Sequence, residues 1–183
     1  TLQNLAELRR IDIIETPVSG TLPAWLGNLA QIRYLGFGAT SLSGTVPLVL
    51  LNLATMQKLL LGSSSVSGTL PEVVAVGVEK SQLEVLEMSH VQISGSLPAA
   101  LGSLSRLRVL EVTSSLLSGT VATSLSNLNH LYFFSVQQVG VSGTLPSLRN
   151  LTGLQYLYTA FSAISGTVPA LDTLTHLVAI LVD

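Results

Sequence analysis

Few side chains in this sequence are of the types that catalyse reactions or bind metals. Its 183 residues include three histidines, ten carboxylates and no cysteine, which excludes disulfide bonds, thiolate zinc sites and a cysteine nucleophile. His130 and His176 occupy the same position of an internal repeat, two repeats apart. About 10 Å would separate them, which is too far for a shared metal ion. We expect both, and His90 near Glu87, to be ordinary surface histidines.

One short motif superficially resembles a nucleotide-binding loop. Gly36, Phe37 and Gly38 lack the third glycine and the following helix that such a loop needs, and they fall within an expected strand. No nucleophile in the sequence stands beside a base in a recognisable arrangement. The sequence therefore predicts no enzyme, no cofactor and no metal site.

Charge and polarity exclude two further classes of protein. Only 10% of the residues are charged and the formal net charge is −2, so basic-patch recognition of nucleic acids is not expected. The long uncharged stretch from Val112 to Leu148 is broken at short intervals by Ser, Thr, Gly, Asn, Gln and Pro. A membrane-spanning helix needs about twenty predominantly apolar residues in succession, so we expect no membrane span.

An internal repeat is the strongest signal in the sequence. The tripeptide Ser-Gly-Thr or Ser-Gly-Ser recurs seven times, at intervals of 24, 24, 27, 24, 24 and 23 residues. Its glycines are Gly20, Gly44, Gly68, Gly95, Gly119, Gly143 and Gly166. A hydrophobic residue follows each copy, and then Pro in six copies, with Ala122 as the exception. The full frame reads L-x-x-L-x-x-L-x-L-x-x-[ST]-x-[LV]-S-G-T-[LV]-P-x-x-L, and such a period predicts a solenoid of stacked repeats.

This frame is identified as a leucine-rich repeat in its 24-residue form, and the S-G-x-[LIV]-P segment resembles plant receptor-type repeats. The resemblance covers essentially the whole chain. It departs from the plant pattern where those repeats place Asn, because the residues here are Thr16, Thr40, Ser64, Val91, Ser115, Val139 and Ser162. Repeats that end in T-x-[VL]-S-G-T-[LV]-P are similar to those of kinetoplastid surface antigens, the promastigote surface antigen group. The resemblance implies an extracellular or cell-surface location.

The position where plant repeats place Asn, which we call the Asn column, affects how successive turns are joined. An asparagine ladder bonds the backbone of successive turns, whereas short hydroxyls do so only in part and valine does not. We therefore expect locally looser turns at Val91 and Val139.

The spacings predict an α/β repeat fold, a right-handed solenoid formed by residues 1–183 as a single array of seven to eight repeats. The L-x-L pair alternates with period two, so it should form short strands that stack about 4.8 Å apart into a parallel sheet on the concave face. Its inward residues should include Leu35, Phe37, Leu110, Val112, Leu157 and Thr159. Glycine permits a tight corner, and Pro should begin a short 3₁₀ or helical turn on the convex face. The 27-residue interval should bulge on the convex side near residues 76–80.

The ends of the array carry no recognisable capping modules. Residues 1–10 begin in the middle of a repeat, and residues 180–183 end on a strand. Either the chain is cut from a longer array, or another chain covers its ends. The second reading makes head-to-tail self-association through apolar ends an alternative function, because unpaired sheet ends are adhesive.

Recognition of a protein or glycan ligand on the concave face is the function that the sequence favours. The outward strand positions vary within a strict frame, as a binding surface would. Aromatic residues gather towards the C-terminal end, and aromatic side chains are favoured interface anchors; packing against one another is the alternative. The candidate ligand-binding residues are Tyr34, Glu87, Glu111, Phe133, Tyr156, Tyr158 and Phe161.

Three smaller signals complete the sequence reading. Glu87 and Glu111 should lie about 5 Å apart on adjacent strands, where a cation, a basic partner or simply solvent screening would relieve their repulsion. The serines and threonines of the tripeptides should form two parallel files of hydroxyls, which makes ice binding a third candidate function. Asn150 begins the sequon Asn150-Leu151-Thr152 and is a glycosylation candidate.

Overall fold

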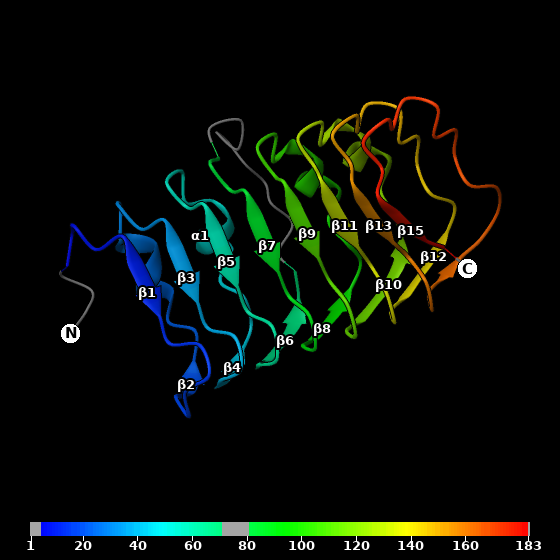
Figure 1. Ribbon diagram of the computed structural model, residues 1–183. Coiled ribbons are helices and arrows are strands. Elements are labelled where there is room, and N and C mark those ends of the chain that lie inside the picture. The colour runs from blue at the N-terminus through cyan, green and yellow to red at the C-terminus, as the bar shows by residue number, and fades with distance from the viewer. Residues whose placement is uncertain (1–4, 71–80, 183) are drawn as a thin grey trace.

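Two parallel sheets form the walls of a solenoid in the computed structural model, which describes residues 5–70 and 81–182. The eight-stranded sheet forms the concave face, and the helical segments lie behind it (Figure 1). In sequence order, its strands are β1 (Arg10–Asp12), β3 (Tyr34–Gly36), β5 (Lys58–Leu60), β7 (Val85–Glu87), β9 (Val109–Glu111), β11 (Phe133–Ser135), β13 (Tyr156–Tyr158) and β15 (Ala179–Leu181). Spatial order equals sequence order, so each repeat contacts only its neighbours.

The L-x-L pair of each repeat supplies the core, as its period predicts. Leu35, Leu110 and Leu157 are fully buried beneath their strands, and Phe37 and Val112 are buried one position beyond. Thr159 is buried as well, although its hydroxyl has no hydrogen-bond partner. The prediction of the inward-facing residues is confirmed.

The Asn column works differently from the expected ladder. Thr40 donates a 2.7 Å hydrogen bond to the carbonyl oxygen of Phe37, three residues earlier in the same turn, and Thr16, Ser64 and Ser162 bond in the same way. Each of these hydroxyls bonds within its own turn, so it braces a single turn rather than joining successive ones. Greater looseness at Val91 and Val139 stays a prediction.

The tripeptides form a second sheet where a simple corner was expected. Its seven strands are β2 (Ser19–Thr21), β4 (Ser41–Gly44), β6 (Ser65–Thr69), β8 (Gln92–Gly95), β10 (Leu116–Thr120), β12 (Gly140–Gly143) and β14 (Ala163–Ile164). In Figure 1 these strands follow one another beside the concave sheet from β2 to β12. These segments, which were expected to be simple corners, therefore form backbone hydrogen bonds between neighbouring repeats along the array.

The register of this second sheet contradicts the expected straight files of hydroxyls. Thr21 is paired with Ser43, and Thr120 with Ser142, so each threonine faces the serine of the next repeat. The serine hydroxyls also donate to glycine carbonyl oxygens of the preceding repeat, as Ser43 does to Gly20 at 3.0 Å. The rows are staggered, and several serine hydrogens are already used within the protein.

Close packing between repeats explains why glycine stands at the centre of the tripeptide. Gly68 has φ +84°, a left-handed conformation that glycine adopts without strain. A Cβ atom added there would lie 2.7 Å from the Thr45 methyl carbon of the preceding repeat. The tripeptide thus pairs a residue without a side chain with a threonine methyl group that covers it.

Replacing Gly68 by alanine is expected to lower the free energy of unfolding by about 1–2 kcal/mol, from backbone strain plus the contact with Thr45. Gly20→Ala is the matched control, since Gly20 also has a positive φ but nothing lies within 4 Å of an added Cβ. Urea denaturation of both variants separates the backbone strain, which both variants have, from the contact with Thr45, which only Gly68→Ala has. Equal losses of stability would show that the methyl contact contributes nothing.

Short helical segments return the chain to the next strand, as the Pro positions predict. They are the 3₁₀ helices η2 (Ala24–Asn28), η4 (Ala99–Ser103) and η5 (Thr123–Asn127) and the α-helical turn α1 (Leu48–Leu51). Pro23, Pro47 and Pro98 precede the first residues of η2, α1 and η4, and Ala122 takes this place before η5. Pro suits this position because it has no N–H to leave unbonded. The bulge expected near residues 76–80 lies outside the described residues.

Candidate functional site

The concave face presents its variable side chains in straight rows. Strand register places the first residues of the strands opposite one another, in the order Arg10, Tyr34, Lys58, Val85, Val109, Phe133, Tyr156 and Ala179. The third residues form a second row, in the order Asp12, Gly36, Leu60, Glu87, Glu111, Ser135, Tyr158 and Leu181. Both rows follow from the fixed L-x-L frame, because a residue on either side of an inward leucine must point outward.

Three of the predicted aromatic residues meet on β11 and β13. The ring centroids of Phe133 and Tyr156 lie 5.9 Å apart, and those of Phe133 and Tyr158 lie 5.6 Å apart with the rings nearly perpendicular at 83°. Ser135, opposite Tyr158, is small and buried. The three side chains are half-buried and support one another. They form a preorganised surface, which we call the aromatic cluster (Phe133, Tyr156 and Tyr158).

The other predicted aromatic residues lie apart from this cluster. Tyr34 is on β3, four strand positions from β11, and its ring lies beneath the Arg10 guanidinium at 3.7 Å. Arg10 also forms an ion pair with Asp12. Phe161 is in the turn after β13, 71% exposed, with a positive φ of 57°. The structure therefore divides the predicted site between two ends of the concave face and one turn.

Glu87 and Glu111 are adjacent, as their spacing predicts, but their environments differ. They are paired in register on β7 and β9. The Glu87 carboxylate accepts hydrogen bonds from the backbone N–H groups of Gly62 at 3.0 Å and Ser89 at 2.9 Å. Burial raises the pKa of Glu111, and the negative charge of Glu87 raises it further, while Ser89 and His90 act in the opposite direction.

This raised pKa gives a pH-dependent stability. The folded protein holds the Glu111 proton more tightly than the unfolded chain does, so the contribution of Glu111 to the free energy of unfolding is largest below both pKa values. It falls as the pH rises through the folded-state pKa. We expect Glu111→Gln to raise stability at pH 7 by a few tenths of a kcal/mol and to flatten this dependence.

Urea unfolding of the wild type and Glu111→Gln across the acidic to neutral range measures this effect, with Glu7→Gln as an exposed control. A stability difference between Glu111→Gln and the wild type that stays constant over the whole pH range would contradict the assignment.

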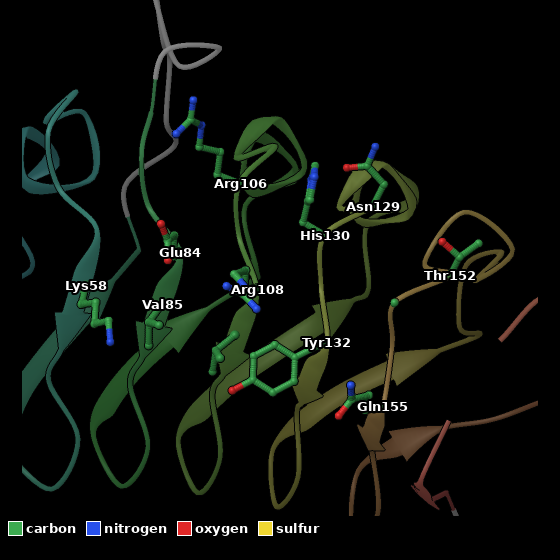
Figure 2. A pocket seen from close by; sticks show the side chains of 12 residues that line it. Lys58, Glu84, Val85, Arg106, Arg108, Asn129, His130, Tyr132, Thr152 and Gln155 are labelled. Carbon is green, nitrogen blue, oxygen red and sulfur yellow. The ribbon is translucent and has the colours of Figure 1, made fainter. Parts of the chain in front are cut away.

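The structure also contains a groove that the sequence did not reveal. It has a volume of about 1000 Å³ and follows the edge of the concave face where the strands begin (Figure 2). Lys58, Glu84, Arg106, Arg108, His130, Tyr132 and Gln155 are among its lining residues. Val109, which also lines the groove, is paired in register with Phe133, so the groove borders the aromatic cluster.

The groove residues come from the first strand position, as at Lys58, Val85 and Val109, and from the positions just before the strands. His130 and Arg106 are exposed, as expected, but both line the groove. His130 Nδ1 lies 2.9 Å from the Ser105 carbonyl oxygen, and His176 Nδ1 makes the equivalent contact with Thr152 at 3.2 Å. The signal available in the sequence was the repeated arginine in one column, at Arg9, Arg33 and Arg108.

The remaining predicted features lie outside the groove and the aromatic cluster. Asn150 is exposed in the turn before Leu151. At the C-terminal end, Ile180 and Leu181 of β15 are 41% and 48% exposed. Leu5 is exposed at the other end, and Leu2 lies outside the described residues. Association of copies through these ends stays a prediction.

The described residues include neither a metal-binding cluster nor a membrane-spanning helix. Residues 5–70 and 81–182 contain no group of three or more His, Asp or Glu side chains that could hold a metal ion. No helix within those ranges has the length and apolar composition needed to cross a bilayer.

Comparison with known proteins identifies the repeat. The Leucine Rich Repeat family model matches residues 82–104. No curated protein sequence matches the chain significantly.

Several solved structures share the fold. The PEPR1–AtPEP1 structure is 25% identical, has a TM-score of 0.90 and covers 96% of this chain. The Arabidopsis receptor kinase HAESA, solved with the peptide hormone IDA and the co-receptor SERK1, is 26% identical, has a TM-score of 0.87 and covers 94% of it. This chain spans 25% and 29% of those two chains.

A plant ice-binding protein shows the same fold at greater distance. It is 18% identical, with a TM-score of 0.65, and the match covers 98% of this chain and 67% of that protein. At this identity the likeness concerns the fold alone. Together with the family match over residues 82–104, these structures show that the chain has a leucine-rich-repeat solenoid fold, structurally similar to plant receptor ectodomains.

Proposed function

We propose that this protein is a non-enzymatic recognition or adhesion scaffold, located outside the cell or on its surface, that binds a protein or glycan ligand on its concave face. The aromatic cluster is the observation that carries the proposal. Its three rings pack at 5.6–6.2 Å from one another and remain half-exposed on a rigid sheet. Rigid, partly exposed aromatic side chains contribute binding area at a small cost in conformational entropy.

Two further observations support recognition. The structurally similar HAESA was solved with a peptide hormone, and the PEPR1 structure likewise contains AtPEP1. The inward residues repeat while the outward rows change character along the sheet, from charged at β1 to aromatic at β13. A scaffold that keeps its shape and varies its outward side chains is suited to selecting a partner.

The two alternative functions keep narrower support. Self-association would use the exposed apolar residues of β15, including Ile180 and Leu181. Ice binding would use the hydroxyl rows, but their stagger and the serine bonds to glycine carbonyl oxygens leave a less regular lattice than two straight files. Of the three functions, ligand recognition has the most direct structural support.

Selection of ligands tests the proposal. The purified chain is screened against a displayed library of random peptides and against a glycan array, in parallel with the variant Tyr156→Ala/Tyr158→Ala. The proposal expects ligands that bind the wild type and are lost with the variant. If every selected ligand binds both proteins equally, the concave aromatic cluster is not the recognition surface.

A further inference from the structure

The groove at the start of the strands carries positive charge that no ion pair among the described residues neutralises. Among its lining residues, Lys58, Arg106 and Arg108 are basic and Glu84 is acidic, which gives a formal charge of +2 in a chain whose net charge is −2. Within residues 5–70 and 81–182, the ion pairs join Arg10 to Asp12 and Arg149 to Asp172. Neither pair includes a groove residue.

The contacts of the groove cations hold them in place without cancelling their charge. The Arg106 guanidinium donates to the Gln82 side-chain oxygen, which is neutral. The Arg108 guanidinium lies 5.7 Å from the centre of the Tyr132 ring. Lys58 and Arg108 are both exposed, and Figure 2 shows them along the same side of the groove, with the Tyr132 ring beside Arg108. This arrangement favours an anionic occupant, because opposite charges attract and orient the partner.

We propose that the groove binds an acidic segment of a polypeptide, continuing onto the aromatic cluster through an apolar side chain. This inference rests on the proposed function, since it names the chemistry of the partner for the same face. From Lys58 to Gln155 the groove crosses four strand spacings, or about 19 Å. A segment of about six extended residues spans that length. Carboxylates of the segment would face Lys58 and Arg108, which lie two strand spacings apart.

The aromatic cluster favours a polypeptide over an acidic glycan. The rings of Phe133 and Tyr158 meet nearly at right angles, and Tyr156 is tilted by 44° and 51° to the other two. No two of the rings are coplanar, so they do not form one flat platform on which a sugar ring would stack. Contact with an apolar side chain needs no such platform, and aromatic residues are common anchors at protein interfaces.

Fluorescence anisotropy with a defined probe tests the inference. The probe is a fluorescein-labelled hexaglutamate followed by Trp and Leu and amidated at its C-terminus; its control replaces each Glu by Gln. The acidic probe is expected to bind the wild type, and the Gln probe at least tenfold more weakly. Raising NaCl from about 0.05 M to about 0.5 M should weaken the acidic probe several-fold, because salt screens exposed charges.

Substitutions locate the binding. Lys58→Ala and Arg108→Ala are each expected to weaken the acidic probe about threefold and together about tenfold. Arg149→Ala, which removes the same charge beside Asp172, should leave binding unchanged. All variants should keep the wild-type circular dichroism spectrum, because the replaced side chains are exposed.

Each remaining outcome separates this inference from the proposed function. Equal binding of the Glu and Gln probes, or unchanged binding in the Lys58→Ala/Arg108→Ala variant, overturns the acidic-segment inference while leaving aromatic recognition standing. Loss of binding with those substitutions but none with Tyr156→Ala/Tyr158→Ala supports the groove and contradicts the aromatic proposal. A sulfated hexasaccharide that binds more tightly than the acidic probe overturns the choice of polypeptide, and so does failure of the probe to bind.

Discussion

Replacing Leu117 by alanine is expected to lower the free energy of unfolding by about 2–5 kcal/mol. Leu117 is on β10, is 1% exposed and packs in the core between the two sheets. Truncating it removes apolar contacts and leaves a cavity in a solenoid layer that the neighbouring repeats cannot close without moving their own strands. Urea denaturation followed by far-ultraviolet circular dichroism measures the change.

The preceding residue provides a matched control on the same strand. Leu116 is 65% exposed, so Leu116→Ala should change the free energy of unfolding by less than about 0.5 kcal/mol. The two variants have the same composition and remove the same atoms. A similar loss of stability in both would mean that the alternation of buried and exposed residues along β10 is wrong.

Replacing both Tyr156 and Tyr158 by alanine is expected to weaken a ligand selected on the concave face by about 2 kcal/mol or more, or about thirtyfold in Kd. The two rings, with Phe133, are the largest half-exposed aromatic group on the described part of the sheet. Isothermal titration calorimetry with the selected peptide or glycan gives the binding free energies. Thermal unfolding by circular dichroism should show that the fold is kept.

Tyr34→Ala is the control for this result. Tyr34 is the same residue type on the same row of the concave face, but it lies four strand positions from β11. We expect its loss to change the binding free energy by less than about 0.5 kcal/mol, since anchors concentrate near the centre of an interface. A larger effect from Tyr34 than from the tyrosine pair would move the binding centre to the N-terminal strands.

Register on the concave face was predictable because the repeat is strict. Each strand contributes one central apolar residue between two outward residues, so the repeat frame aligns Glu87 with Glu111 and Phe133 with Tyr156. The second sheet was harder to predict. Gly44 and its equivalents are typical of turns and have a left-handed φ, and only the pairing of their strands with the next repeat shows that they belong to a sheet.

The candidate site was likewise predictable from the sequence only in part. The aromatic cluster could be predicted because Phe133, Tyr156 and Tyr158 occupy outward positions of neighbouring repeats. The groove could not, because its two arginines lie outside the strands, where the frame leaves side-chain direction open. Arg108 shares a sequence column with Arg9 and Arg33, but only the structure places Arg106 and Arg108 in one groove with Lys58 and Tyr132.

The solenoid, its inward apolar residues and the order of side chains along the concave face were predictable from the sequence, because they depend on a local periodicity that every repeat shares. The stagger of the hydroxyl rows, the bracing of turns by Thr40 and its equivalents, and the charge of the groove are visible only in the folded array. These properties depend on the offset between neighbouring repeats and on how far each side chain reaches. The period of a sequence sets neither distance.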